Sequence, residues 1–368
     1  MSVTLQPRLN YRFTLSDFGQ GLIGLCRKAD DTELKDYLSA DKIYYYNHAR
    51  TAMRIALSAL NLEEGAGIAL TAYNCLTVFH AVDLAGYKPV FIDIADDFQM
   101  DMEDFRKKRS QFSAVIINHF FGIPCRSILT IKKEFPDLPV IEDCAHSFGS
   151  KIEGCPTGVF GDFATFSYGM AKFPSVRDGG YMLVNTKRFV PRIEEENEKL
   201  GTPSFWAEIK NLVSGLIMSF LGEPFIYKNL TKPYLKGVES KKDLSGKYAT
   251  KESLAYRSNR YVFMKKLRRV PGRLAEQQRV AGIWMKELGL EGVIDPNSNS
   301  FMLPVLVTNR EELIQKYMDK GIELGAHFSK SIGWAVDFGY KFGDCPHAEK
   351  VCRNVLTLPT YYDVSARL

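Results

Sequence analysis

Two charged residues in the middle of the chain have the surroundings of catalytic groups. Asp143 ends the apolar run Pro139–Asp143, and His146 follows it three residues later. A carboxylate at the end of a buried strand must be hydrogen-bonded, paired or protonated, although it could also simply cap the next helix. Lys172 lies five residues after Ser167, which opens a turn, and its neighbours are small or apolar. Poor solvation there favours the neutral, nucleophilic form of the lysine amine.

The combination of this aspartate with this lysine is more informative than either residue alone. A lysine before a glycine pair, here Gly179 and Gly180, would usually lie on the surface, and such glycines let the backbone pass close to a bulky group. An acidic residue after one strand and a lysine after another are, however, the two fixed partners of pyridoxal phosphate. The lysine forms a Schiff base with it, and the carboxylate keeps its pyridine nitrogen protonated. Ser167 and the N-terminus of a helix at Thr51 could supply the donors that the phosphate needs.

The elements expected around these residues alternate between helix and strand over residues 51–185. Repeated strand–helix–strand units predict a mainly parallel sheet between helices, with the ligand outside the carboxyl ends of the strands. Apolar runs closed by polar residues predict the strands, and segments of helical length separate them. The expected strands are Ile68–Tyr73, Pro89–Asp93, Ala114–Asn118, Pro139–Asp143 and Phe163–Phe166, and the expected helices are Thr51–Leu60, Leu76–Ala85 and Ser127–Glu134.

The remainder of the chain is expected to form two further parts. Residues 186–270 combine charge clusters with an apolar, aromatic stretch and predict a helical insertion or connector. A long helix from Val270 to about Leu288, a strand at Phe301–Val307 and a helix at Glu311–Lys320 predict a smaller α+β domain. The resulting division is a large cofactor-binding domain over residues 1–185, a connector over 186–270 and a C-terminal domain over 271–368.

Composition excludes several classes of protein. The chain has 368 residues, of which 45% are hydrophobic and 25% charged, so a disordered or fibrous protein is excluded. A net charge of +5 is too small to indicate nucleic-acid binding. The seven cysteines are scattered without a CxxC pair, which argues against disulfides and a structural zinc site. With no secretory signal and no uncharged stretch of about 20 residues, we expect a cytoplasmic protein without a transmembrane segment.

Several segments, in the same order along the chain, resemble the DegT/DnrJ/EryC1/StrS family of sugar aminotransferases. This family has the type I fold of pyridoxal-phosphate-dependent enzymes, which implies an α/β large domain with a mainly parallel mixed sheet plus a smaller C-terminal domain. The segments similar to family motifs are Ala49–Met53, Leu84–Asp93, His119–Pro124, Ile141–Gly149 (IEDCAHSFG), Asp162–Lys172 (DFATFSYGMAK), Cys345–Glu349 and Val355–Tyr361.

The resemblance implies a role for each matched residue. Lys172 would be the Schiff-base lysine and proton carrier, and Asp143 would pair with the pyridine nitrogen. The cofactor-stacking residue of the family, usually aromatic, aligns with Cys75, and Tyr73 lies two residues earlier, so the stacking residue stays open. The partner-subunit motif of the family has no convincing match near Lys247–Leu254. The other implied cofactor contacts are His146 near the phenolic oxygen, with Thr51, Ser167 and Arg50 at the phosphate.

The implied function is transfer of an amino group, by resemblance from L-glutamate, to a nucleotide-linked keto-sugar for surface polysaccharide or natural-product synthesis. The family's cofactor site lies at a subunit interface, so a homodimer is implied. One alternative is a sugar dehydratase, in which histidine replaces the lysine at the position of Lys172. Another is a regulatory or binding protein without turnover.

An apolar stripe in Phe205–Phe225 departs from the family pattern. Large apolar residues recur at three- and four-residue spacing, which predicts one face of a helix. We expect this face to pack in the dimer or between domains, and a weak contact with a membrane surface or a hydrophobic acceptor is the alternative. The residues of the stripe are Trp206, Ile209, Leu212, Val213, Leu216, Ile217, Phe220 and Leu221.

Overall fold

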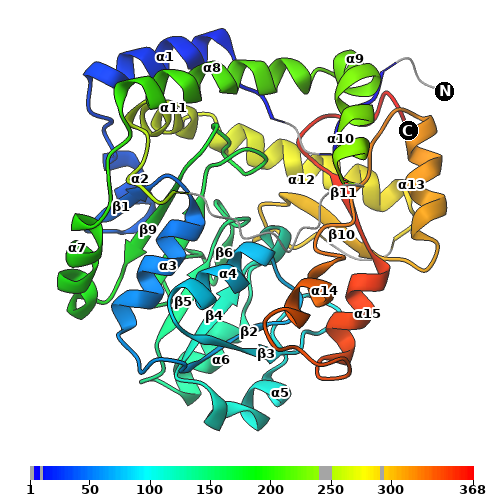
Figure 1. Cartoon of the computed structure of the whole chain (residues 1–368). Helices are drawn as coiled ribbons and strands as arrows, with labels where there is room; N and C mark the ends of the chain where they lie inside the picture. Colours follow the sequence, from blue (N-terminus) through cyan, green and yellow to red (C-terminus); the bar gives the residue numbers. More distant parts are fainter. Residues whose placement is uncertain (1–3, 9–10, 240–250, 291–293) are drawn as a thin grey trace.

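The computed structural model describes residues 4–8, 11–239, 251–290 and 294–368 (Figure 1). Its centre is a seven-stranded sheet with the order β1-β9-β8-β5-β4-β2-β3. The five strands from β8 to β3 are parallel to one another, whereas β9 is antiparallel to β8 and β1 is antiparallel to β9. The predicted α/β fold with a mainly parallel, mixed sheet is therefore confirmed. The strands are β1 (Ile43–Tyr46), β2 (Gly67–Thr71), β3 (Lys88–Ile92), β4 (Ala114–Asn118), β5 (Val140–Asp143), β8 (Phe163–Ser167) and β9 (Gly180–Val184).

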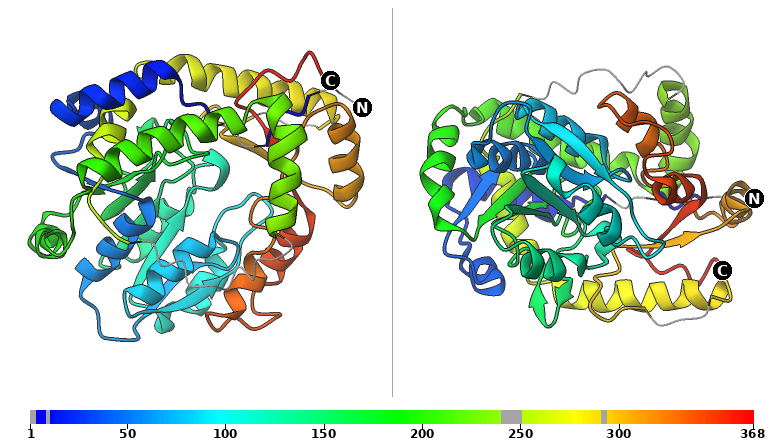
Figure 2. Two further views of the ribbon diagram at one scale, coloured as in Figure 1. Left: turned by 45° about the horizontal axis from the view of Figure 1, so that its top comes forward. Right: turned by 90° about the horizontal axis from the view of Figure 1, so that it is seen from below.

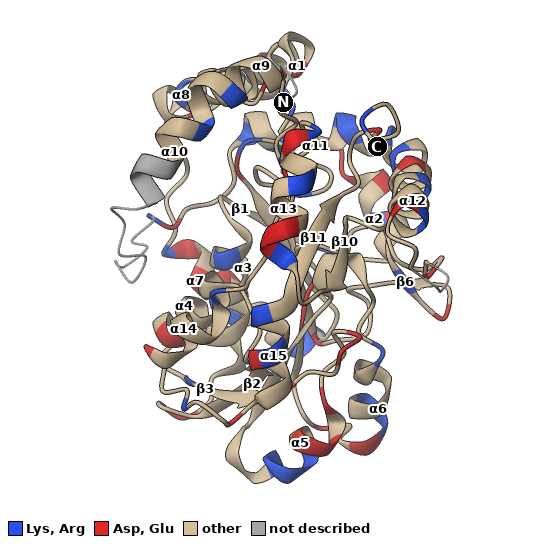
Figure 3. Cartoon of the chain, turned by 90° about the vertical axis from the view of Figure 1, so that its right-hand side faces the viewer, with Lys and Arg blue, Asp and Glu red and all other residues tan. Residues whose placement is uncertain are grey.

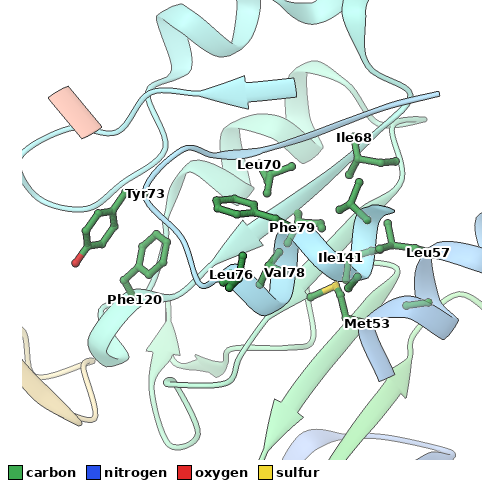
Figure 4. Close-up of a cluster of buried hydrophobic side chains, with 14 of the residues drawn as sticks. Met53, Leu57, Ile68, Leu70, Tyr73, Leu76, Val78, Phe79, Phe120 and Ile141 are labelled. Carbon is green, nitrogen blue, oxygen red and sulfur yellow. The ribbon is translucent and has the colours of Figure 1, made fainter. Parts of the chain in front are cut away.

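Both faces of the sheet are buried against helices, because its parallel strands are apolar at nearly every position. Ala114 and Ile116 of β4 join the core beneath α3 (Ala49–Leu60) and α4 (Leu76–Leu84), part of which Figure 4 shows. Val115 and Ile117, on the opposite side of the same strand, join the core under α5 (Met102–Lys107) and α6 (Ser127–Glu134). The helices predicted at residues 51–60, 76–85 and 127–134 are thus present within two residues of their expected ends.

The C-terminal part of the chain forms a smaller α+β unit around the antiparallel pair β10 (Met302–Leu306) and β11 (Val355–Pro359). Trp284 and Tyr317 form the centre of its core. The N-terminal segment also contacts this unit, since Gln6 forms an isolated parallel β-bridge with Ile322. The three-part division of the chain stays a prediction. The helices of this unit are α12 (Val270–Glu287), α13 (Arg310–Asp319), α14 (Ser331–Val336) and α15 (Pro346–Asn354).

A helical layer lies across the top of the molecule in Figure 1, and the left-hand view of Figure 2 brings it forward. It combines α1 (Leu15–Cys26) with α8 (Phe205–Leu221) and α11 (Arg257–Leu267), and α1 contacts both of the others. Among the described residues no single helix is long and apolar enough to cross a membrane, although α8 and the following segment to Leu235, bent by 70°, pass such a test together. The remaining helices and strands are α2 (Thr32–Leu38), β6 (Lys151–Ile152), β7 (Cys155–Pro156), α7 (Val190–Glu198), α9 (Pro224–Ile226) and α10 (Lys232–Glu239). A π-helical turn lies at Tyr227–Thr231, and short 3₁₀ turns lie at Arg109–Gln111, Phe120–Gly122 and Lys187–Phe189.

Candidate active site

The predicted site residues meet in a cavity of about 330 Å³ at the carboxyl ends of the central strands. Asn118 of β4 is paired in register with Asp143 of β5, and Asp143 with Thr165 of β8, so three neighbouring strands end at the cavity floor. This is the edge at which parallel α/β sheets bind their ligands. Six of the eight predicted residues line the cavity: Arg50, Cys75, Asp143, His146, Ser167 and Lys172.

Lys172 lies in hydrogen-bond contact with His146, at 2.8 Å between Nζ and Nε2. The amide N–H of Phe121 points at the other ring nitrogen, Nδ1, at 3.3 Å. Since Nδ1 accepts that bond, the neutral ring carries its proton on Nε2 and donates it to the lysine, which therefore needs a free lone pair. Burial lowers the pKa of Lys172, and burial together with the lysine charge lowers the pKa of His146 well below its ordinary value. Both shifts favour the uncharged forms of the two side chains.

Asp143 is held by a chain of amides that crosses two strands. Asn118 donates from Nδ2 to Asp143 Oδ2 at 2.8 Å, and the amide N–H of Ala145 donates to Oδ1 at 3.1 Å. Asn74, after β2, donates in turn to Asn118 Oδ1 at 2.8 Å. Burial raises the pKa of Asp143, while these hydrogen bonds and the charge of Lys172 oppose the rise. A carboxylate fixed in this way is prepared for a cationic partner inside the cavity.

The opposite end of the cavity is formed by the N-terminus of α3 and by Ser167. His48, the N-cap residue of α3, makes no side-chain cap bond, and it lines the cavity with Ala49. The helix approaches closely because a Cβ at Gly180 would lie 2.3 Å from the Ala49 nitrogen. Gly179, with φ of +152°, likewise lies against the Tyr168 ring. The close approach expected at these two glycines is therefore present, and the helix end offers N–H donors and a positive dipole to an anion.

Thr51 and Tyr73 do not line the cavity. The hydroxyl of Thr51 donates to Asn47 Oδ1 at 2.9 Å, so this buried side chain supports the start of α3 from behind. Tyr73 donates to the carbonyl of His327 at 2.7 Å and packs edge-on against Phe120, with ring centroids 5.3 Å apart (Figure 4). Of the two positions left open for stacking, Cys75 is the one that faces the cavity.

Several cavity residues were not among the predicted ones. Asn118 lies at the end of an expected strand, and a polar residue at that place is a signal from which a cavity residue could have been predicted. Its contact with Asn74 could not, because it depends on the strand order β5-β4-β2. Phe328 comes from the C-terminal unit and stacks on His146, with ring centroids 5.7 Å apart. No local pattern marks it, because a phenylalanine in a loop is most often an ordinary core residue.

A buried polar group beside the site is structural rather than metal-binding. Among the described residues, His119, Glu142 and Cys144 present possible ligand atoms within 4.8 Å of one another. However, His119 already accepts from the Cys125 N–H and contacts Glu142 at 3.0 Å. Glu142 also accepts three backbone N–H bonds from the loop before β8. These groups satisfy one another, and they fix the strand ends that carry Asp143 and Asn118.

A second cavity, of about 510 Å³, adjoins the first at Lys172. Its wall is basic: Arg12, Arg269 and Arg273 line it, together with an ion pair between Lys266 and Asp17 at 3.2 Å. Phe301 and Tyr361 supply apolar surface. An anion with an attached ring system could therefore lie here with one end at the lysine amine.

The residues around the first cavity fit pyridoxal phosphate. A lysine amine with a lowered pKa suits its aldehyde, a carboxylate held by two donors suits its protonated ring nitrogen, and an open helix N-terminus suits its phosphate. Fold and site together define the fold type I class of pyridoxal-phosphate-dependent transferases. This agrees with the solved structure of the putative sugar aminotransferase Spr1654 from Streptococcus pneumoniae in its PLP form, which covers 97% of this chain and 94% of its own at a TM-score of 0.74 and 17% identity.

The chain belongs to the DegT/DnrJ/EryC1/StrS aminotransferase family, whose model matches residues 22–201 and 261–367. The resemblance found in the sequence is thereby confirmed. A GDP-perosamine synthase from Escherichia coli O157:H7 is 32% identical over 150 residues, which are 40% of this chain and 41% of that protein. The uncharacterized protein MJ1066 from Methanocaldococcus jannaschii is 23% identical over 89% of this chain and 83% of its own. The match thus spans less than half of the GDP-perosamine synthase but most of the archaeal protein.

Proposed function

We propose that the protein is a pyridoxal-phosphate-dependent aminotransferase that moves an amino group from L-glutamate to a nucleotide-linked keto-sugar, for surface polysaccharide or natural-product synthesis. The observation that carries the proposal is the contact of Lys172 with His146 in one cavity with the carboxylate of Asp143. In the overall exchange, glutamate becomes 2-oxoglutarate and the keto-sugar becomes an amino-sugar.

Each residue has a defined task in this proposal. Bound pyridoxal phosphate supplies an aldehyde for the amine and a ring that accepts electrons. Lys172 would hold it through Nζ and later carry a proton on the same atom between the two half-reactions. His146 orients that amine through the Nε2–H bond, and Asp143 would keep a proton on the ring nitrogen. Ser167 and the first N–H groups of α3, with Arg50 beside them, would bind the phosphate.

The basic second cavity supports a phosphorylated acceptor. Arg12, Arg269 and Arg273 line the same cavity as Lys172, so they are available to the phosphates of a sugar nucleotide whose keto carbon reaches that lysine. Guanidinium groups suit such phosphates because they donate bidentate hydrogen bonds. Several relatives, including the GDP-perosamine synthase, are named as enzymes of nucleotide-linked sugars, which favours the same substrate class.

The proposal includes a homodimer. The family match supports it. The first half of Lys247–Leu254, the stretch where the partner-subunit motif has no convincing match, lies outside the described residues. Of the alternatives, the dehydratase is disfavoured because position 172 is lysine rather than histidine. A binding protein without turnover remains a distinct outcome of the experiment below.

The test combines covalent labelling with turnover. Purified protein with the cofactor is reduced with borohydride and digested, and the labelled peptide is sequenced; the label should lie on Lys172. Glutamate is then supplied with a panel of nucleotide-linked keto-sugars while 2-oxoglutarate is measured. Lys172→Ala should abolish both signals, and Lys151→Ala, at an exposed lysine of β6, should retain them. A label elsewhere would contradict the site, and a label on Lys172 without turnover for any acceptor would favour the binding protein.

A further inference from the structure

Helix α8 carries polar residues on its buried face and apolar residues on its exposed face, which is the reverse of an ordinary surface helix. Its inner face carries the buried residues Glu208, Asn211, Leu212 and Gly215, of which two are polar. Glu208 accepts hydrogen bonds from the first N–H groups of α11, including that of Arg257 at 2.8 Å. Its outer face is a stripe at helical spacing: Trp206, Lys210, Val213, Ile217 and Phe220. Trp206 is 76% exposed, Ile217 53% and Phe220 59%.

This exposure differs from what the sequence pattern predicts. Of the eight apolar residues in the expected stripe, Leu212 is fully buried, whereas Trp206, Val213, Ile217 and Phe220 are exposed, so this half of the stripe does not pack within the described chain. Packing in a dimer stays a prediction. The polar residues occupy the inner face instead because each has a partner there. Asn211, for example, donates to Asp178 at 2.7 Å.

Helix α1, which lies beside α8 in Figure 1, has the same inversion. Its only carboxylate, Asp17, turns inward to Lys266. Gly21 also faces inward and allows the close contact, since a Cβ there would lie 2.4 Å from Leu212. Leu15, Leu22 and Ile23 are exposed, Leu15 by 78%. The two helices therefore share one apolar outer surface.

The segment after α8 extends this surface. Phe225, Leu230, Tyr234 and Leu235 are exposed large side chains on α9, the π-helical turn and α10. We call the outer side of α1, α8 and this segment the apolar face. In Figure 3, which colours charged residues, the ribbons of α1, α8 and α9 are mostly tan.

The charges on the apolar face are mainly basic. Lys210 lies within the stripe of α8, and Arg27 and Lys28 are exposed directly after α1. The carboxylates of both helices are turned inward, and the exposed carboxylates Glu223 and Asp30 follow the helix ends. A face of this kind, apolar with scattered lysines and with aromatic residues such as Trp206 and Tyr234, suits the boundary between lipid headgroups and acyl chains.

Part of the apolar face lies outside the match to the family model. The family model matches residues 22–201 and 261–367, so α8, α9 and α10 lie in the unmatched segment between them. No residue of α8 is among those that line the cofactor cavity, although α8 supports the neighbouring Asp178 through Asn211.

We propose that the apolar face binds the surface of a bilayer that contains anionic lipids. The helices would lie in the plane of the interface with Trp206, Ile217 and Phe220 among the upper acyl chains and Lys210 at the phosphates. They would not cross the bilayer, because α8 and its successor are bent by 70° and the inner side of α8 is tied to α11 through Glu208. This proposal rests on the surface alone and does not depend on the proposed function.

Vesicle flotation tests the proposal. Full-length protein is mixed with vesicles of phosphatidylcholine alone or with 30% phosphatidylglycerol, and the bound fraction is measured after flotation. The wild type should float with the anionic vesicles, and the emission of Trp206 should shift to shorter wavelength. Ile217→Glu with Phe220→Glu should reduce binding at least tenfold. The matched control is Phe342→Glu, which places the same charge at a 74% exposed aromatic residue of the C-terminal unit.

The experiment distinguishes a bilayer from a second copy of this chain as the partner of the apolar face. Circular dichroism and thermal denaturation establish that each variant is folded. A wild type that stays unbound at all vesicle concentrations would overturn the proposal. So would a double variant that floats like the wild type. If the wild type ignores vesicles but dissociates into smaller species when Ile217 and Phe220 are replaced, the apolar face is an interface between copies of this chain, and the bilayer proposal is wrong.

Discussion

Replacing Asp143 by asparagine should weaken cofactor binding much more than it changes the stability of the protein. The carboxylate accepts from two donors, Asn118 Nδ2 and the N–H of Ala145. An asparagine has one carbonyl oxygen, so it can serve one of them and presents its own NH₂ to the other. Burial raises the pKa of Asp143, however, which means that the ionised group is costly in the folded protein without a partner cation. The variant loses a hydrogen bond, which destabilises the fold, but it also loses the unfavourable burial of a charge, which stabilises it. Because these effects oppose each other, the free energy of unfolding should change by no more than about 2 kcal/mol.

The effect on the cofactor has no such compensation. A hydrogen bond to a charged group contributes about 1.5–3 kcal/mol. Since about 1.4 kcal/mol corresponds to a factor of ten, Asp143→Asn should raise the dissociation constant of pyridoxal phosphate by about ten- to a hundredfold. The constant is measured by absorbance titration of apoprotein, and stability by chemical denaturation of the same sample.

The double variant Asn118→Asp with Asp143→Asn separates the two roles of the carboxylate. It exchanges the groups between neighbouring strands, so the side-chain hydrogen bond between positions 118 and 143 can form in the reverse direction while the charge moves away from position 143. Stability should then be close to that of the wild type, and cofactor binding should remain weak. If Asp143→Asn binds the cofactor as tightly as the wild type, the residue only caps the following turn and the assignment fails.

Four further results are expected. Asn118→Leu should weaken cofactor binding without touching the cofactor itself, because it removes the donor that fixes Asp143; equal titration curves for variant and wild type would contradict this. Gly180→Ala should reduce stability by several kcal/mol in chemical denaturation, because its Cβ would lie 2.3 Å from the backbone of Ala49. Burial, with Lys172, lowers the pKa of His327 from 6.5 to about 3. The unfolded chain therefore takes up a proton that the folded protein does not, stability falls as the pH drops from about 6.5 toward 3, and His327→Gln should flatten that loss in acid titrations. Leu216→Asp, at a half-buried position of α8, should lower thermal stability and weaken cofactor binding, and a variant unchanged in both would show that this helix is not anchored to the body.

The sequence predicted most of the sheet and the catalytic pair because those features are local. Apolar runs closed by polar residues marked β2 to β5, and helical spacing marked α3, α4 and α6. The strands β1, β9 and β11 were not predicted. The run Ile43–Tyr46 has no alternation, since β1 is buried on both sides. Gly180, at the start of β9, weakens any strand pattern there, although the close approach of α3 requires it.

The positions that were not predicted depend on contacts between distant parts of the chain. Asn74 and Asn118 meet only because β2 and β4 are neighbours in the sheet, 44 residues apart. The same reason explains α8. Its apolar residues, by spacing alone, predict a buried face, but the burial of Glu208 and Asn211 is decided by Ser258 and Asp178, which lie 50 and 33 residues away. A pattern in one helix cannot show which side has partners.

These distant contacts also join the apolar face to the cofactor cavity. Asn211 and Ser214, on the inner side of α8, bond to Asp178 and Arg177, and the next residue, Gly179, lines the cavity. Asn259 of α11 donates to the carbonyl of Asp178 at 2.7 Å, so this turn is held from two helices at once. Because the outer stripe of α8 makes none of these bonds, the helix can present Ile217 and Phe220 to another surface while its inner side keeps the wall of the cavity in place. The inverted polarity of α8 thus gives one helix two separate tasks, and changes on its two faces should have separable effects on vesicle binding and on cofactor binding.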